Sequence, residues 1–358
     1  MMLPFCTPLN FTDIQKILFL RKDNLGDLLY TLPLTTLLKQ HYPQLRIDFL
    51  VPAYSAPLAQ CYADADQVLI LPDSIKPSGD AYRSTVDAIK TQHYDMAFNI
   101  HPKFVLAKLA FAARIPHRLT RTERLYALYA NHWVWQQRKH QRQHELDYNL
   151  DLLHGWINPP DRQAIPFNFQ TSAVAAAKVE TFLQHHQFRH FTLIHPGSNG
   201  SAIDLPLNLY GDLIDAYPLP GTVIITGTAK ESPLYQQLSR HCRKPLIDAT
   251  GQFSLEELLC LIQRCTLLIS NSTGPLHIAR AFNKPLLGFY STLKSAHPRR
   301  WGPYGQEQSH TLIPANENFA TFQTDLKQCR ANMAAIKVTD IMRKLDTILA
   351  EPTRCQPT

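Results

Sequence analysis

The sequence predicts an α/β protein made of two Rossmann-like halves. Strand-like apolar runs alternate with helix-like runs from residue 16 onward, which is typical of βα units and parallel sheets. Residues 158–170, which begin with two prolines in a row after Asn158, interrupt this alternation, and it restarts beyond them. A length of 358 residues also suggests two domains. The natural architecture has the two halves facing each other across a cleft, with ligands at the carboxyl ends of the strands.

The first domain, residues 1–160, is expected to contain four strands and four helices. The first strand is a short apolar run, and the helix after it has its apolar residues on one face. The expected strands are residues 16–21, 46–51, 67–71 and 95–100. The expected helices are residues 28–40, 55–62, 81–92 and 144–156.

The second domain, residues 161–335, shows the same alternation. Its expected strands are residues 191–195, 222–226, 265–269 and 286–290. Its expected helices are residues 172–185, 207–216, 234–242, 255–263 and 276–282. Residues 336–358 form a terminal helix and tail, a candidate to pack back on the first domain.

Composition excludes wholesale disorder, because 45% of the residues are apolar and 18% are charged. A net charge of +7 and a pI of about 9.0 favour acidic partners. We expect no nucleic-acid partner, because the basic residues are dispersed apart from one cluster at 138–142 and no nucleic-acid-binding motif accompanies them.

Cysteine usage and hydropathy predict a cytoplasmic protein. The seven cysteines are odd in number and lack CxxC spacing, which indicates reduced thiols. No signal peptide is apparent and no run of 18 apolar residues occurs. We therefore expect a cytoplasmic location, with peripheral contact at the inner-membrane surface. No zinc spacing or calcium loop occurs, so no obligatory metal or cofactor is expected.

Residues 270–277 are the most informative segment, because they connect an apolar strand to a helix. Thr273 can cap the helix, Gly274 allows close approach of a ligand, and Pro275 suits a first helical turn. The N–H groups and dipole of such a terminus bind anions such as a diphosphate. An ordinary helix cap is the alternative.

A second polar loop, residues 23–27, follows the first predicted strand. Gly26 permits a tight turn, and Asp27 starts the next helix. The carboxylate of Asp27 either caps that helix or acts as a general base toward an attacking hydroxyl.

Three more loops follow strands of the second half. Residues 195–202 offer backbone and hydroxyl donors to a phosphate, although a flexible loop is the alternative. In residues 226–231, Glu231 either accepts hydrogen bonds from a ribose or compensates a helix dipole. Residues 294–305 gather cations and aromatic side chains, either around a diphosphate or as a solvated basic loop.

These motifs resemble, in the same order, those of glycosyltransferase family 9, the ADP-heptose:lipopolysaccharide heptosyltransferases. The resemblance rests on residues 17–33, 144–150, 195–198, 271–277 and 300–305.

The resemblance implies a GT-B fold and an inverting, metal-independent sugar transfer from a nucleotide diphosphate. By the family pattern Asp27 is the catalytic base. Donor contacts then fall on Ser198, Asn199, Glu231, Asn271, Ser272, Thr273, Gly274, Pro275, His277 and Lys294. Acceptor contacts fall on Asn24, Gly26, His101, Lys103, Arg118 and Arg121. The expected donor is ADP-heptose, and the expected acceptor is a lipid-linked anionic glycan such as a lipopolysaccharide core.

The chain departs from the family pattern where a lysine or arginine usually follows the HPG motif. Ile203 or Asp204 occupies that position, so Lys230, Lys294 or Arg299 is left to supply the charge. A different nucleotide-sugar donor, or a non-catalytic nucleotide-sugar or glycan-binding homologue, are the alternatives. A sugar-nucleotide epimerase of similar architecture is a third reading.

Overall fold

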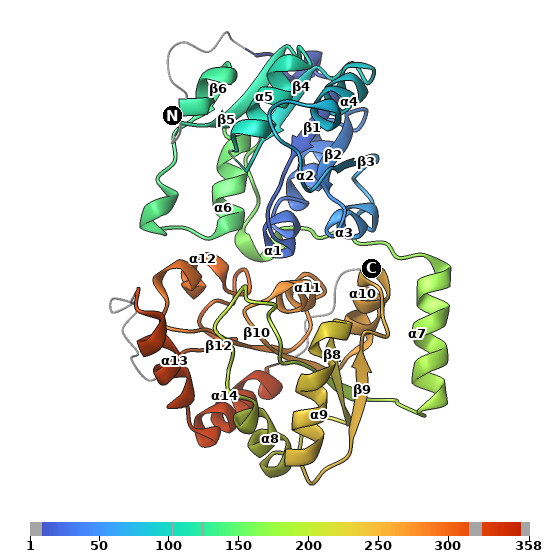
Figure 1. Ribbon diagram of the computed structural model, residues 1–358, viewed down its shortest axis with the longest axis vertical. Coiled ribbons are helices and arrows are strands. Elements are labelled where there is room, and N and C mark those ends of the chain that lie inside the picture. The colour runs from blue at the N-terminus through green and yellow to red at the C-terminus, as the bar shows by residue number, and fades with distance from the viewer. Residues whose placement is uncertain (1–8, 102, 123–124, 315–323, 352–358) are drawn as a thin grey trace. The chain divides into compact units, whose positions relative to one another are not determined.

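The computed structural model describes residues 9–101, 103–122, 125–314 and 324–351, and it divides into two compact units (Figure 1). Residues 1–170 form the first unit and residues 171–358 the second. The segment after residue 160 belongs to the first unit, because Gln170 N donates to Cys61 O at 2.7 Å. No helix of the described ranges is long and apolar enough to cross a membrane.

The first unit is built on a six-stranded parallel sheet with the order β3-β2-β1-β4-β5-β6. This is the Rossmann order. The strands β1 to β3 follow one another toward one edge of the sheet, and the chain then returns to place β4 on the other side of β1. The strands are β1 (Lys16–Leu20), β2 (Arg46–Pro52), β3 (Gln67–Leu71), β4 (Met96–Asn99), β5 (His117–Arg121) and β6 (His132–Val134).

The helix predicted at 28–40 is two helices, α1 (Leu25–Leu29) and α2 (Pro33–His41). Pro33 has no N–H to donate to the preceding turn, so it begins a new helix instead of continuing the first. Gly26 lies inside α1 and makes no tight turn. The other helices of this unit are α3 (Ala56–Gln60), α4 (Asp80–Lys90), α5 (Phe104–Ala112) and α6 (Glu145–Leu150).

Sequence patterns did not predict α5, β5 or β6. Helix α5 is apolar at eight of its nine positions, so it has no polar face to reveal a helical period. Strand β5, His-Arg-Leu-Thr-Arg, is mostly polar, and its pairing with β4 and β6 identifies it as a strand.

The second unit repeats the same sheet order, β12-β11-β10-β7-β8-β9, with its reversal between β7 and β10. Its strands are β7 (Phe191–His195), β8 (Thr222–Gly227), β9 (Leu246–Thr250), β10 (Leu267–Asn271), β11 (Leu286–Phe289) and β12 (Thr311–Leu312). Its helices are α7 (Ala173–His185), α8 (Leu207–Ala216), α9 (Ser232–His241), α10 (Leu255–Arg264), α11 (Gly274–Ala281), α12 (Pro298–Trp301), α13 (Leu326–Ala334) and α14 (Val338–Ala350).

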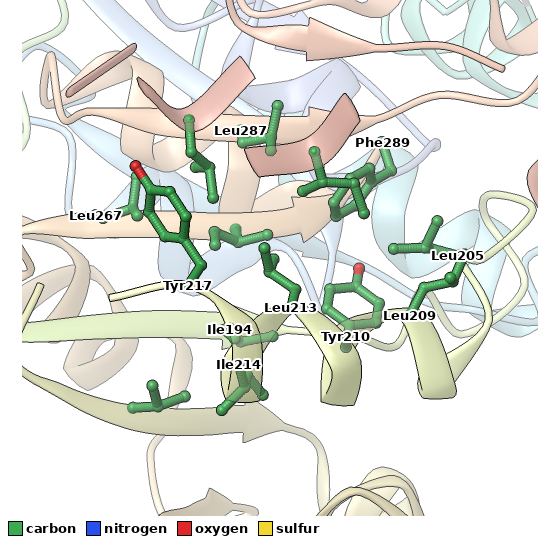
Figure 2. Packing of buried hydrophobic residues seen from close by; sticks show 14 of the residues in the cluster. Ile194, Leu205, Leu209, Tyr210, Leu213, Ile214, Tyr217, Leu267, Leu287 and Phe289 are labelled. Atoms are coloured by element: carbon green, nitrogen blue, oxygen red, sulfur yellow. The ribbon is translucent and has the colours of Figure 1, made fainter. Parts of the chain in front are cut away.

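The terminal helix α14 packs within the second unit. Its buried residues Ile341, Leu345 and Ile348 belong to the core that α8 and β11 share. Figure 2 shows Leu213 of α8 and Leu287 of β11 in the same interior. The apolar face of α14 is thus buried within the second unit, and the suggested packing of this segment on the first domain stays a prediction. Residues 352–358 of the tail lie outside the described ranges.

Candidate functional site

In the first unit, polar side chains gather where the strand order reverses. Asp23 and Asp27 follow β1, while Asn99 ends β4 and His101 comes two residues later. The two strands are direct neighbours, with Leu20 opposite Asn99. Ligands of open α/β sheets bind at this reversal, beyond the carboxyl ends of the strands.

Arg21, directly after β1, is almost fully buried and holds both carboxylates. Its Nε donates to Asp23 Oδ1 at 2.7 Å, and its Nη2 donates to Asp27 Oδ1 at 3.0 Å. Its Nη1 donates to Thr31 Oγ1 at 2.6 Å. Burial acts to lower the pKa of Arg21, but the charges of Asp23, Asp27 and Glu145 outweigh it and raise that pKa above its ordinary value.

Helix α6 contacts this cluster, and a second buried arginine, which precedes α6 in the chain, binds to it. Arg138 donates to Glu145 and, at 3.2 Å, to Asn149 Oδ1. Glu145 in turn lies 3.5 Å from Arg21 Nη2, and Asn149 Nδ2 donates to Tyr30 O at 2.8 Å. Each charge therefore has a partner of opposite sign, which a buried ionic cluster needs. The motif at 144–150 thus contacts Arg21, which pairs with Asp27, and Tyr30, which directly follows helix α1.

Asp27 combines a fixed position with access to solvent. Its side chain is 14% exposed, and it lies in the first turn of α1, where a carboxylate interacts favourably with the helix dipole. Asn24 occupies the N-cap position of that helix without a side-chain capping bond. A carboxylate held in this way can accept a proton from a bound hydroxyl.

Asn99 is a candidate site residue that the sequence analysis missed. Its side chain is buried, with 5% of the residue exposed, yet neither its amide nitrogen nor its amide oxygen has a hydrogen-bond partner among the described residues. A buried unpaired amide is costly and therefore suggests a role in ligand binding. No local sequence signal distinguishes it from an ordinary residue at the end of a strand.

The residues that are predicted to bind the acceptor differ in their location and exposure. His101 Nδ1 lies 3.5 Å from Asp23 Oδ2, and burial lowers the pKa of His101 although Asp23 opposes this. Lys103 is exposed at the start of α5, and Arg121 ends β5 at the same edge of the sheet.

Arg118 is removed from the acceptor site by its contacts. Its Nε donates to Tyr129 O at 2.8 Å, and its Nη1 donates to the carbonyls of Ile115 and Pro116. It also lies near the amino end of β5, opposite to the edge where ligands are expected. These bonds give it a structural role.

In the second unit, Asn271 ties together the two strands at the reversal. It ends β10 and is fully buried. Its Nδ2 donates to Pro196 O at 2.6 Å and to Asp204 Oδ1 at 3.1 Å, and its Oδ1 accepts from Leu205 N at 2.9 Å. Its amide is used by the protein, so Asn271 shapes the loop after β7 rather than contacting a ligand through free donors.

The hydroxyl groups of Ser270 and Thr273 organise the turn into α11. Ser270 Oγ donates to His195 O at 3.1 Å and lies 3.0 Å from Thr273 Oγ1. Thr273 occupies the N-cap position with extended backbone, but its hydroxyl makes no capping bond. Gly274 and Pro275 form the first turn of α11, and Ser272 before them is partly exposed. The backbone here thus begins a helix at Gly274 as expected, and the anion site at this helix terminus stays a prediction.

The loop after β7 turns sharply. Asn199 and Gly200 both adopt positive φ, and Ser201 N donates back to Ser198 O at 2.9 Å. Ser198 is buried, and its hydroxyl bonds Ala202 of the same loop at 3.3 Å. The loop is therefore a defined turn.

Residues 203 and 204, where the family usually has a lysine or arginine, have other roles in this structure. Ile203 packs against the hydrophobic core of the second unit, so its side chain has an apolar role. Asp204 is held by Asn271. Burial raises the pKa of Asp204, and the charge of Glu231 raises it further. A hydrogen bond from Ser198 lowers this pKa but does not cancel the effect of burial.

Glu231 closes the turn after β8. Its Oε2 accepts from Thr228 N at 2.7 Å and from Thr228 Oγ1 at 2.9 Å, which is a capping box. Its other oxygen lies over Gly197, where a Cβ atom would stand 2.0 Å from Oε1. The geometry displays a capping role, which neither of the two readings from the sequence named, and the contact with Gly197 links the loops after β7 and β8.

Two buried histidines and an exposed lysine complete this edge. Burial lowers the pKa of His277 to about 4, and it also lowers that of His195, whose Nδ1 lies 3.0 Å from Thr226 Oγ1. Lys294 is exposed just beyond β11. Within the described ranges, no three His, Cys, Asp or Glu side chains are grouped to hold a metal ion.

Comparison with known proteins identifies sequence relatives of this chain. The chain is 32% identical over 311 residues to a Haemophilus influenzae protein whose name specifies a glycosyltransferase but no sugar or acceptor, covering 83% of this chain and 88% of the relative. It is 27% identical over 283 residues to lipooligosaccharide heptosyltransferase 2 of Haemophilus ducreyi, covering 76% and 81%.

Solved structures share the fold. A family 9 glycosyltransferase of Veillonella parvula superposes with a TM-score of 0.81 at 17% identity, covering 96% of this chain and 99% of the other. The ADP-heptose LPS heptosyltransferase II of E. coli gives 0.73 at 19% identity, covering 94% and 98%. The two parallel sheets with their helices are thus an α/β GT-B fold.

A sequence model of glycosyltransferase family 9 (heptosyltransferase) matches residues 82–331, which is most of the chain. With this match and a relative above 30% identity, the chain belongs to glycosyltransferase family 9 and is a glycosyltransferase.

Proposed function

We propose that this enzyme transfers heptose from ADP-heptose to a lipopolysaccharide core or a related anionic glycan, with inversion at the anomeric carbon. The observation that carries the proposal is the carboxylate of Asp27, which Arg21 holds at 3.0 Å while part of its surface stays accessible. The names of the heptosyltransferase relatives support the choice of sugar and acceptor.

In the proposed reaction, an acceptor hydroxyl attacks the anomeric carbon of the donor and gives its proton to Asp27. The bond from the anomeric carbon to the diphosphate oxygen breaks, and ADP leaves with the electron pair. The leaving group gains negative charge, so fixed dipoles and cations near it lower the barrier. We assign that role to the N-terminus of α11 at Gly274 and to Lys294.

The remaining assignments follow from the contacts. Ser198 and Asn199 would line the donor loop, with Asn271 as a positioning residue behind it. Glu231 would hold the ribose through its Oε1, since Oε2 is used by Thr228. On the acceptor side, Asn99 and the cations Lys103 and Arg121 would bind hydroxyl and acidic groups of the glycan.

The test of the base is Asp27→Asn, with Asp23→Asn as the matched control. Both carboxylates pair with Arg21 and are similarly exposed, at 14% and 15%. Loss of a general base should lower turnover by about 10²- to 10⁴-fold. The control should lose much less, and both variants should bind ADP as the wild type does. Equal losses in the two variants would assign the effect to the Arg21 cluster and reject Asp27 as the base.

The donor is tested by thermal unfolding with ADP, UDP and GDP. A nucleotide that binds only the folded protein raises its stability according to the ratio of concentration to Kd. Selective stabilisation by ADP is expected, and preference for UDP or GDP would reject ADP-heptose. ADP binding without any transfer to a core acceptor would favour the non-catalytic homologue.

A further inference from the structure

The turn after β2 exposes a tyrosine ring beside the proposed base. Tyr54 comes two residues after the carboxyl end of β2, and the residue is 56% exposed. Its hydroxyl nevertheless donates a hydrogen bond to the backbone carbonyl of Asp23. Asp23 shares Arg21 with the proposed base, Asp27. One end of the ring is therefore held on the loop after β1, while a large part of the side chain stays open to a ligand.

The charges around Tyr54 also indicate that it lies near the two carboxylates. Partial burial raises the pKa of Tyr54 to about 12, and the charges of Asp23 and Asp27 add to this increase, whereas Arg21 opposes it. The phenol therefore keeps its proton at neutral pH. It remains a hydrogen-bond donor and presents an uncharged ring beside the carboxylates.

The turn that carries Tyr54 is well defined. The backbone N–H and the hydroxyl of Ser55 both donate to Pro52 O, at 3.1 and 3.2 Å. The helix that follows, α3, packs against α1, which contains Asp27. The exposed ring therefore has a fixed position next to the helix of the proposed base.

The sheet order places two different kinds of group on the two sides of Asp27. Strand β1 lies between β2 and β4, so the loop with Asp27 has Tyr54 on the β2 side and Asn99 on the β4 side. Tyr54 offers an aromatic ring, and Asn99 offers a buried amide without a hydrogen-bond partner in the described ranges. A sugar ring presents matching surfaces, because its C–H groups form an apolar face and its hydroxyl groups lie around the edge.

We propose that Tyr54 is the platform on which the acceptor sugar stacks, with the attacking hydroxyl directed to Asp27. This inference rests on the proposed function and deepens it, because it assigns recognition of the reacting sugar to an uncharged ring. The cations Lys103 and Arg121, on the other side of β1, then bind the acidic groups of the glycan. Stacking fixes the plane of the sugar, so its hydroxyl meets the carboxylate in one orientation.

The test compares Tyr54→Ala, which removes the ring, with Tyr54→Phe, which keeps the ring and removes its hydroxyl. Phe111→Ala is the control for loss of an exposed aromatic ring, because Phe111 is 51% exposed near the carboxyl end of α5. Helix α5 leads from the end of β4 to the start of β5, so this position lies toward the edge opposite to the expected ligand edge. Both substituted positions are exposed, and each variant should melt close to the wild type.

Kinetics are measured with ADP-heptose and the water-soluble core oligosaccharide of a heptose-deficient lipopolysaccharide. Tyr54→Ala should raise KM for the oligosaccharide by roughly tenfold, since one aromatic contact is lost, and should leave KM for ADP-heptose unchanged. Tyr54→Phe should stay within about twofold of the wild type, because the ring remains. Phe111→Ala should match the wild type. Equal losses in Tyr54→Ala and Tyr54→Phe would assign the effect to the hydroxyl that holds Asp23, and would overturn the proposal.

Salt separates stacking from the action of the cations. Stacking on a neutral ring involves no net charge, whereas salt screens the attraction between Lys103 and acidic groups. The ratio of acceptor KM between Tyr54→Ala and the wild type should stay constant from about 0.05 to 0.5 M NaCl. The same ratio for Lys103→Ala should shrink toward one. A Tyr54→Ala ratio that also shrinks would show that the effect is one of charge, which contradicts stacking.

A binding measurement separates this inference from the proposed function. Calorimetric titration of the same oligosaccharide needs no sugar donor. If the wild type binds it but transfers no heptose, the proposed function is rejected, and weaker binding by Tyr54→Ala still supports the platform. Unchanged binding by Tyr54→Ala would reject the platform even where heptose transfer by the wild type is observed.

Discussion

Two asparagines occupy equivalent places in the two units, and their surroundings differ. Asn99 ends β4 and Asn271 ends β10, each the fourth strand of its sheet along the chain. The amide of Asn271 makes bonds to Pro196 and Leu205 on the neighbouring loop. The amide of Asn99 has no hydrogen-bond partner in the part of the chain that the structure describes. One residue type therefore serves as a structural tie in one unit and is available for a ligand in the other.

Alanine substitution should separate these two roles. Asn271→Ala leaves buried backbone groups unpaired and should lower the free energy of unfolding by about 2–3 kcal/mol. Asn99→Ala removes an unpaired amide and should leave stability within about 0.5 kcal/mol, or raise it. It should raise KM for the acceptor if Asn99 binds it. Urea denaturation and acceptor kinetics measure these effects, and a large loss of stability in Asn99→Ala would contradict the assignment.

At the level of elements, the loops after β7, β8 and β10 form one connected edge. Asn271 joins β10 to the loop after β7, and Glu231 joins that loop to the turn after β8 through its contact with Gly197. A methyl group on Gly197 would meet the Glu231 carboxylate, which would have to move away from its present position. A change in one loop should therefore be felt in its neighbours.

Gly197→Ala tests this connection. The new methyl group would collide with Glu231 and break its capping bonds to Thr228, which should cost about 1–2 kcal/mol and weaken nucleotide binding. In Gly197→Ala/Glu231→Ala the collision is gone, so the double variant should be at least about 0.5 kcal/mol more stable than the sum of the single effects predicts. Strict additivity in urea denaturation would show that the two loops are independent.

At the scale of the whole molecule, each unit has a core of its own. The core of the second unit is closed by α8, β11 and α14, and that of the first by its own helices and sheet. Free energy of unfolding is therefore set unit by unit, and ionisable groups buried in one unit act on the stability of that unit. His277 in α11 and His132 in β6 are such groups, because burial lowers the pKa of each to about 4.

Acid should therefore destabilise the second unit through His277. An unfolded histidine binds a proton below a pKa of about 6.5, whereas the folded His277 stays neutral to about pH 4. The unfolded state thus takes up more protons between these values, and stability should fall by up to about 3 kcal/mol as pH drops from 6.5 to 4. His277→Gln should reduce this slope in second-unit peptides, where the buried His195 still contributes, and leave it unchanged in first-unit peptides, measured by hydrogen exchange. An unchanged slope would contradict the role of His277.

The sequence by itself determined the alternation of strands and helices, the two-unit division, the family, and the loops at the strand ends that carry Asp27, Glu231 and Thr273. These features depend on local patterns, such as apolar runs, prolines and motif spacing. They are visible because the residues that create each pattern are neighbours in the chain.

Only the tertiary structure decided which side chains of those loops are already engaged. Arg118 is used by nearby carbonyls, Asn271 holds a loop about 70 residues away in sequence, and Asn99 is left unpaired among the described residues. It also showed that Leu125 and Leu128, ordinary apolar residues in the sequence, are both exposed. The physical reason is that hydrogen-bond partners and exposure depend on which strands lie side by side, and a one-dimensional pattern does not contain that information.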